Sequence, residues 1–108
     1  MPEARQHYRL RYPYVLRPNL RSGGLCLPVI DICEAGLRFA KPRNASAQIG
    51  AEIEATLHFS CGEVVLIRGS VVRLTERDAA LQLERRISFG YIMREQRNLM
   101  EKAPYSVH

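Results

Sequence analysis

The sequence lacks the residue sets that build common structural centres. It contains no tryptophan, only two lysines, and three cysteines with no CxxC spacing among them. An odd number of cysteines without that spacing supports neither a disulfide framework nor a zinc site. The three histidines, at positions 7, 58 and 108, have no partner at a ligand spacing. We therefore expect no metal, no cofactor and no disulfide-stabilised scaffold.

Long apolar runs and common catalytic motifs are also missing. No apolar stretch approaches the ~20 residues of a membrane-spanning helix, and the first residues, MPEARQHYRLRYP, lack the apolar centre of a secretory signal. There is no GxGxxG or GxxxxGK[ST] loop, no HExxH and no GxSxG. His58 and Cys61 flank a turn, with nothing nearby to orient the histidine. We expect a cytoplasmic protein that is not an enzyme and does not insert into a membrane.

The sequence does contain enough apolar residues for one core, together with an uneven excess of arginine. Its 108 residues are 46% hydrophobic, which suits a single domain. The formal charge is +5, and residues 1–22 contribute a net +4 from five arginines against Glu3. Because arginine binds phosphate through a planar fork and stacks on bases, this asymmetry predicts an anionic partner. The alternative is that these arginines only make the surface soluble.

Consecutive strands are indicated from residue 12 onward. The segment AEIEATLHF alternates strictly, with apolar residues at 51, 53, 55, 57 and 59 and polar residues between them. Gly69 suggests a bulge or bend in the longest strand. Short turns join most of these segments, which predicts a mainly β fold, a six-stranded antiparallel barrel or split barrel. The expected strands are residues 12–21, 25–32, 37–41, 51–59, 64–76 and 79–84.

The end of the chain has a different pattern, which predicts a helix over residues 88–102. In FGYIMREQRNLMEK, apolar residues recur at helical spacing after Ser88, which is a suitable N-cap. The opposite, polar side is expected to hold Arg94, Glu95, Arg97, Asn98 and Glu101. One amphipathic helix would then pack on the barrel. The chain divides into a flexible arginine-rich arm, residues 1–11, and one domain, residues 12–108.

A candidate site lies where the arm meets the first predicted hairpin. Pairing its two strands about the SGG turn makes opposite positions sum to about 45 or 46, which places Asp31 opposite Tyr14 or its neighbour. The arm with Arg5 and Arg9 continues beyond that end of the first strand. Asp31 is therefore expected beside the two arginines, although it is remote from them in the sequence.

Two further residues are expected at the same place. Cys33 shares the parity of Asp31 along the strand, and the turn at Gly36 lies at the same end. A carboxylate accepts from N1–H and N2–H₂ of guanine, whereas arginine donates to guanine O6 and N7 or to phosphate. A ligand with guanines and phosphates would provide a hydrogen-bond partner for both arginines and for the aspartate of this site. The other interpretation is that Asp31 caps the turn and forms a surface salt bridge with Arg9.

The same residues resemble a known family. Arg5-Gln-His-Tyr-Arg9 resembles the RxxxR motif of PilZ domains, and Asp31-Ile-Cys-Glu-Ala-Gly36 resembles their second motif, [DN]x[SA]xxG. The order and separation of the motifs, and six strands followed by a helix, are similar to PilZ across nearly the whole chain. The resemblance implies a bacterial receptor for the second messenger cyclic di-GMP. Binding would order residues 1–11 and present a new surface to a protein partner of unknown identity.

The resemblance also implies roles for individual residues. The two arginines would hold phosphate and guanine, the aspartate would bind guanine, the cysteine would lie against the base, and the glycine would shape the turn. A third arginine, on the longest strand, occupies a position where some family members have an aromatic residue under the base. The residues assigned to the ligand in this way are Arg5, Arg9, Asp31, Cys33, Gly36 and Arg73.

Two positions depart from the family pattern at the site. Position 33 is cysteine where serine or alanine is usual, and cysteine donates hydrogen bonds poorly. This could lower the affinity, or oxidation of Cys33 could block the site. Position 4 is alanine where some relatives have a further arginine, which argues against two stacked ligand molecules.

Two other functions stay open. One is a PilZ-like adaptor that binds no nucleotide and serves pilus or motility assembly. The other is a small basic barrel that binds nucleic acid without sequence specificity. The absence of tryptophan and of an evident aromatic row across the strands argues against the second. We therefore expect neither DNA nor RNA as a partner.

Overall fold

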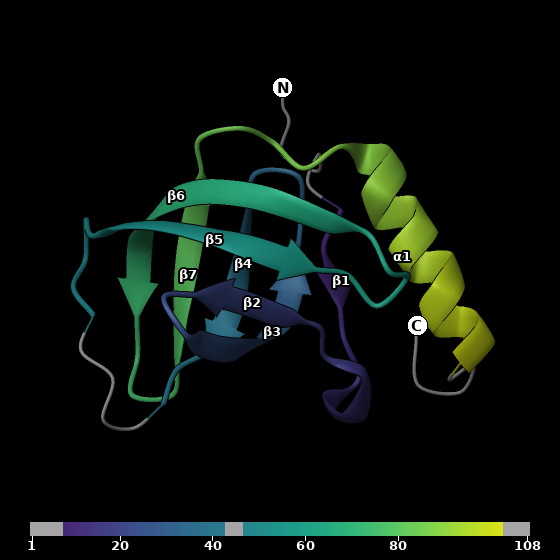
Figure 1. The fold of residues 1–108 in the computed structure, drawn as a ribbon, viewed down its shortest axis with the longest axis horizontal. Helices are drawn as coiled ribbons and strands as arrows, with labels where there is room; N and C mark the ends of the chain where they lie inside the picture. Colours follow the sequence, from purple (N-terminus) through teal and green to yellow (C-terminus); the bar gives the residue numbers. More distant parts are fainter. Residues whose placement is uncertain (1–7, 43–46, 103–108) are drawn as a thin grey trace.

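The computed structural model describes residues 8–42 and 47–102, and these contain seven strands, one short 3-10 helix and one α-helix (Figure 1). All strand pairs are antiparallel. In chain order the elements are β1 (Leu10–Arg11), the 3-10 helix η2 (Tyr14–Leu16), β2 (Asn19–Ser22), β3 (Leu25–Ile32), β4 (Gly36–Ala40), β5 (Glu52–His58), β6 (Val64–Leu74), β7 (Asp78–Leu83) and α1 (Phe89–Lys102).

Six of the strands close into a barrel. Their order around the ring is β3-β2-β5-β6-β7-β4, and β4 pairs back with β3. β1 lies outside this ring and pairs with the end of β3, where Leu10 is opposite Ile32 and Arg11 is opposite Asp31. The predicted fold class, a six-stranded antiparallel barrel with one C-terminal helix, is confirmed.

The strand predicted over residues 12–21 is wrong in its extent. Pro13 and Pro18 flank the 3-10 helix η2, which separates β1 from β2. A proline has no N–H to donate, so it interrupts the ladder of hydrogen bonds that a continuous strand needs. Only the last part of the predicted strand is therefore extended, as β2, while residues 12–18 form a loop that joins β1 to β2.

This interruption changes the register of the first hairpin. Asp31 lies opposite Arg11, so the predicted pairing with Tyr14 is wrong. Leu10 and Arg11, which we expected in a flexible arm, form β1 and belong to the fold. Residues 1–7 of that arm, with Arg5, lie outside the described residues. The expected position of Asp31 beside Arg9 nevertheless agrees with the structure, because Arg9 directly precedes β1 and its side chain contacts Asp31.

Strict alternation along the strands fills the barrel with apolar side chains. Along β5, Ala55 and Leu57 are buried while Glu52 and Glu54 are exposed, as the alternating segment predicts. The helix α1 covers one side of the barrel next to β1 (Figure 1). No helix in residues 8–42 and 47–102 is both long and apolar enough to cross a membrane.

One carboxylate on the buried face of α1 was expected on its polar side. Glu95 is fully buried and accepts hydrogen bonds from the Tyr12 hydroxyl at 2.5 Å, from the Ser60 backbone and hydroxyl, and from the Cys61 backbone N–H. Ser60 and Cys61 form the turn between β5 and β6. Burial, and then the Glu95 charge, raise the pKa of the Tyr12 hydroxyl far above its usual range. Glu95 thus joins the helix to the turn and to the segment after β1.

Candidate functional site

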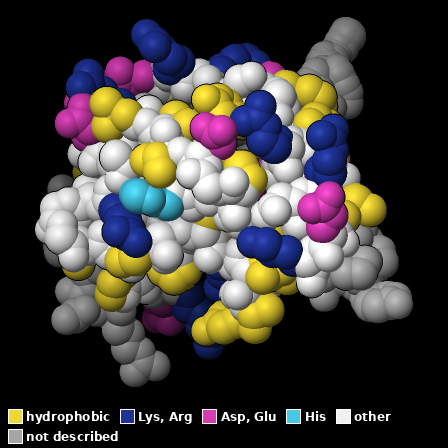
Figure 2. All heavy atoms as spheres, turned by 45° about the vertical axis from the view of Figure 1, so that its right-hand side comes forward, with side chains coloured by type: hydrophobic (Ala, Val, Ile, Leu, Met, Phe, Trp, Pro, Cys, Tyr) yellow, Lys and Arg dark blue, Asp and Glu magenta, His cyan; other side chains and the backbone are white. Residues whose placement is uncertain are grey.

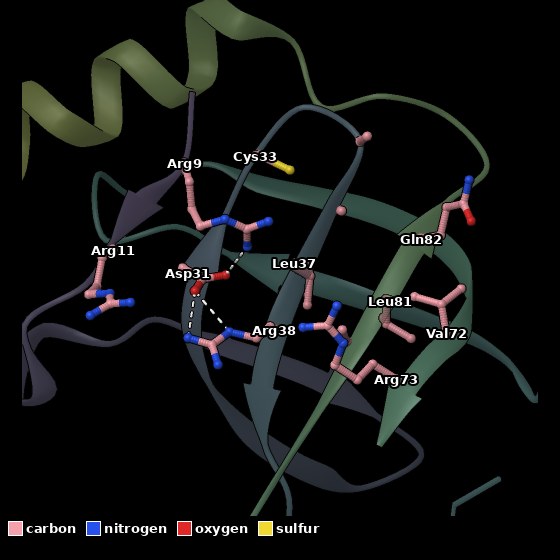
Figure 3. A pocket seen from close by; sticks show the side chains of 13 residues that line it. Arg9, Arg11, Asp31, Cys33, Leu37, Arg38, Val72, Arg73, Leu81 and Gln82 are labelled. Carbon is pink, nitrogen blue, oxygen red and sulfur yellow. Dashed lines mark hydrogen bonds and ion pairs between the residues drawn. The ribbon is translucent and has the colours of Figure 1, made fainter. Parts of the chain in front are cut away.

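A cavity of about 760 Å³ lies over the neighbouring strands β3, β4, β7 and β6, beside β1 (Figure 3). Its lining includes every described residue that the sequence assigned to a ligand, namely Arg9, Asp31, Cys33, Gly36 and Arg73. The sixth, Arg5, is not among the described residues. Residues far apart in the sequence are therefore brought to one place.

A β-bulge turns Asp31 toward this cavity. Val29 is opposite Phe39 and Asp31 is opposite Arg38, so β3 has one more residue than β4 between the two pairs. Regular alternation would place Asp31 on the face of Val29, which points into the core. Because of the bulge, Ile32 enters the core instead and Asp31 faces the cavity.

A second bulge does the same for Arg73 on β6. Val71 is opposite Leu81 and Arg73 is opposite Ala80, so Val72 is the additional residue. Val71 is buried in the core, and without the bulge Arg73 would share its face. The predicted bulge at Gly69 is wrong, since that residue pairs regularly with Leu83. Both Val72 and Arg73 line the cavity as a result.

The Asp31 carboxylate is held between two arginines (Figure 3). Arg9 Nη1 donates to Oδ1 at 2.8 Å, while Arg38 Nε donates to Oδ2 at 2.9 Å and Arg38 Nη2 lies 2.8 Å from the same oxygen. The Asp31 side chain is 0% exposed. Its hydrogen bond raises the pKa of the Arg38 guanidinium. The expected salt bridge between Arg9 and Asp31 exists, but its carboxylate is buried rather than at the surface.

Positive charge exceeds negative charge in the lining. Besides Arg9 and Arg38, the cavity contains Arg11 and Arg73, and Asp31 is the one carboxylate among the lining residues. Arg73 lies at the opposite side from Asp31, with β4 and β7 between their strands. Exposed arginines on two sides of one hollow suit an anionic ligand that spans it.

Gly36 begins β4 where the chain passes very close to β7. A Cβ atom at this position would overlap the backbone carbonyl oxygen of Leu81. The φ angle of Gly36 is not positive, so the turn itself does not require glycine. The expected role in shaping the turn is therefore corrected: the glycine permits the close contact between β4 and β7 that forms the cavity floor.

Cys33 lies on the cavity side, as its parity with Asp31 predicts. It is a free, buried cysteine, and its backbone N–H donates to the carbonyl oxygen of Gly36 at 2.8 Å. This bond closes the tight turn between β3 and β4. In Figure 3 its sulfur projects above the strands near Arg9.

Sequence reasoning missed two arginines of this cavity. Arg38 could have been found by pairing the second hairpin in the same way as the first, since a turn at CEAG places it opposite Asp31. Arg11 could not, because its position depends on the interruption at η2. Within the described segments, no group of three or more His, Cys, Asp or Glu side chains could hold a metal ion.

Comparisons of the chain with protein-family models, with curated proteins and with solved structures found no match. The function is therefore argued from the cavity and its residues.

Proposed function

We propose that this chain is a PilZ-like receptor for cyclic di-GMP and that the cavity over β3, β4, β7 and β6 is its ligand site. One observation carries the proposal: the five described residues that the sequence assigned to the ligand, which span positions 9 to 73, all line one cavity. Its volume of about 760 Å³ lies in the range of small-molecule sites. On this proposal the protein is a non-catalytic bacterial signalling receptor in the cytoplasm.

The chemistry of the lining matches the two kinds of group in cyclic di-GMP. The phosphates would be bound by the exposed arginines Arg9, Arg11 and Arg73, through charge-assisted hydrogen bonds. Asp31 would accept from the N1–H and N2–H₂ groups of one guanine. Cys33 is small enough to leave room for the base beside it. No cofactor is needed for such binding.

The segment from Tyr8 to Tyr12, which includes β1, would connect the ligand to a partner surface. Arg9 contacts Asp31 in the cavity, whereas Tyr8 and Tyr12, on either side of it, contact α1. The Tyr8 hydroxyl donates to Gln96 Oε1 at 2.7 Å, and its ring meets Phe89 edge to face. We propose that a ligand which moves Arg9 orders the arm and alters the surface around α1.

A second candidate is the adaptor that binds no nucleotide. It is favoured by one observation, namely that both oxygens of Asp31 already have arginine partners, as in a purely structural ion-pair cluster. Nonspecific nucleic-acid binding has less support. On the face shown in Figure 2, lysine and arginine side chains lie apart, with acidic and apolar ones between them, rather than in a continuous stripe.

Calorimetry with cyclic di-GMP tests the proposal. We expect wild type to bind, and Arg9→Ala and Asp31→Ala to bind roughly tenfold or more weakly, since each removes a charge-assisted bond. Arg97→Ala is the control, because it removes one positive charge from an exposed position on α1 that is not part of the cavity lining. Binding should weaken as salt is added.

Absence of heat for wild type at micromolar protein would overturn the proposal. Capture of a partner protein that is unaffected by the nucleotide would then favour the adaptor.

A further inference from the structure

The Asp31 carboxylate, which the proposed function assigns to guanine, is closed off in this structure. Its side chain is 0% exposed, Oδ1 is bonded to Arg9, and Oδ2 is bonded to Arg38. A guanine edge can form hydrogen bonds with this carboxylate only after an arginine has moved away. The identity of that arginine determines what a ligand must carry.

The two arginines are held very differently. Arg38 lies within β4, directly opposite Asp31, and two of its nitrogens contact Oδ2. Its Nη1 also lies 3.7 Å from Asp78 Oδ2, and its side chain is 29% exposed. Arg9 precedes β1, its Nη1 meets Oδ1, and its side chain is 51% exposed. Arg9 is therefore the arginine that can leave at the lower cost.

We propose, as an extension of the proposed function, that Arg9 is a removable cover over Asp31 and that Arg38 is the positioning residue that keeps the carboxylate oriented. A ligand phosphate draws the Arg9 guanidinium away, and one charge-assisted hydrogen bond replaces another. Oδ1 then becomes free to accept from guanine, while Oδ2 stays bonded to Arg38.

This arrangement makes recognition conditional on two groups in one molecule. A ligand with guanine and no phosphate has no anionic group that could replace the Asp31 carboxylate as the hydrogen-bond partner of Arg9, so Arg9 stays bonded to Asp31. A phosphate without guanine opens the cover and leaves Oδ1 without a donor, which is costly for a buried carboxylate. The site therefore selects phosphorylated guanine nucleotides over either part alone.

The role of Arg9 as a cover can be measured with guanosine, which carries the guanine edge and no phosphate. Arg9→Ala removes the cover, so this variant should bind guanosine more tightly than wild type, by roughly two- to tenfold. The same variant should bind cyclic di-GMP more weakly. Adenosine, which lacks paired N1–H and N2–H₂ donors, is the control ligand and should show no gain.

Amide chemical shifts in ¹⁵N spectra provide the readout, because they follow weak binding and report folding in the same experiment. Two double variants should lose the gain for guanosine. Arg9→Ala with Asp31→Ala removes the acceptor, and Arg9→Ala with Arg38→Gln removes the positioning residue. If the latter spectrum loses its dispersion, Arg38→Lys takes its place.

Each outcome decides a separate point. If Arg9→Ala bound guanosine no more tightly than wild type, or gained as much affinity for adenosine, the proposal that Arg9 covers Asp31 would be wrong. A gain that persists without Asp31 would contradict that proposal as well. Failure of wild type to bind cyclic di-GMP would overturn the proposed function, while the guanosine comparison would still support or overturn the cover.

Discussion

Asp31 and Gly36 lie at the two ends of the DICEAG segment, and neighbouring strands constrain both of them. Asp31 is covered by an arginine from β4 and by one that precedes β1. Gly36 has no space for a side chain because the Leu81 carbonyl oxygen of β7 is too close. Ion pairs thus constrain Asp31, and lack of space constrains Gly36. A substitution of Asp31 should therefore affect ligand binding, and a substitution of Gly36 should affect stability.

Gly36→Ala should lower the free energy of unfolding by about 1–3 kcal/mol, because its Cβ must displace the backbone of β7. Urea denaturation measures the change. Gly90→Ala is the matched control, since its Cβ would meet only the Ser88 hydroxyl at 3.5 Å. This control lies in the first turn of α1, and we expect it to raise stability by about 0.5–1 kcal/mol. Equal effects of the two substitutions would contradict the close contact.

The helix α1 is attached to the barrel by a polar cluster as well as by apolar packing. Ile92 and Leu99 are fully buried, and Glu95 lies between them on the same face. Glu95 accepts hydrogen bonds from Tyr12 and from the turn between β5 and β6. A carboxylate buried in this way specifies where the helix docks, because a shifted helix would leave it without donors.

Glu95→Ala should lower the free energy of unfolding by about 3 kcal/mol, because the buried Tyr12 hydroxyl and half-buried donors of Ser60 and Cys61 lose their acceptor. Glu101→Ala removes an exposed carboxylate from the same helix and is expected to change stability by no more than about 0.5 kcal/mol. Denaturant unfolding of both variants provides the comparison. A small loss for Glu95→Ala would mean that apolar packing alone holds α1.

The same cluster predicts a loss of stability at alkaline pH. Burial raises the pKa of Tyr12 in the folded protein, so above its ordinary value of 10.0 the unfolded chain releases a proton that the folded protein keeps. Stability is therefore fully present below about pH 10 and falls above it, by up to about 1.4 kcal/mol per pH unit. Tyr12→Phe should remove this part of the slope between pH 9 and 11, as measured by urea unfolding. Identical slopes would show that the hydroxyl ionises equally in both states.

At the scale of the whole molecule, the segment from Tyr8 to Tyr12 lies between the cavity and α1. Arg9 contacts Asp31 on the cavity side, while Tyr8 and Tyr12 contact Gln96 and Glu95 of the helix. Figure 1 shows β1 in this intermediate place, outside the closed ring. A strand held by one neighbour can shift without opening the barrel, which suits β1 to the proposed connection between a ligand and a partner surface.

Cyclic di-GMP should therefore change the amide signals of Phe89 and Gln96, although neither residue lines the cavity. Tyr8→Phe, which lacks the hydroxyl that donates to Gln96, should reduce this response at the helix while the response near Asp31 stays. Tyr14→Phe, on the exposed η2 helix, is the matched control and should change neither. A helix response that is unchanged in Tyr8→Phe would contradict this route.

Features that depend on neighbouring residues were predicted correctly from the sequence, whereas features that depend on pairing between distant segments were not. Alternation in AEIEATLHF depends on side chains within one strand and predicted β5 and its buried face correctly. The bulges in β3 and β6 depend on mismatches between strands, which no local pattern reveals, and they decide where Asp31 and Arg73 point. The expectation that Glu95 lies on the polar side of α1 was wrong. Its hydrogen-bond donors come from segments that are remote in the sequence, and helical periodicity does not show them.

The sequence by itself determined the number of barrel strands, the helix at the end of the chain and the residue types gathered around DICEAG. These follow from local periodicity, turn residues and charge, which act over a few positions. Only the tertiary structure decided that Asp31 and Arg73 face the cavity, that β1 separates from β2, and that Gly36 permits the close contact with β7. The physical reason is register: an extra residue in one strand moves side chains to the opposite face, and only the pairing of distant strands sets it.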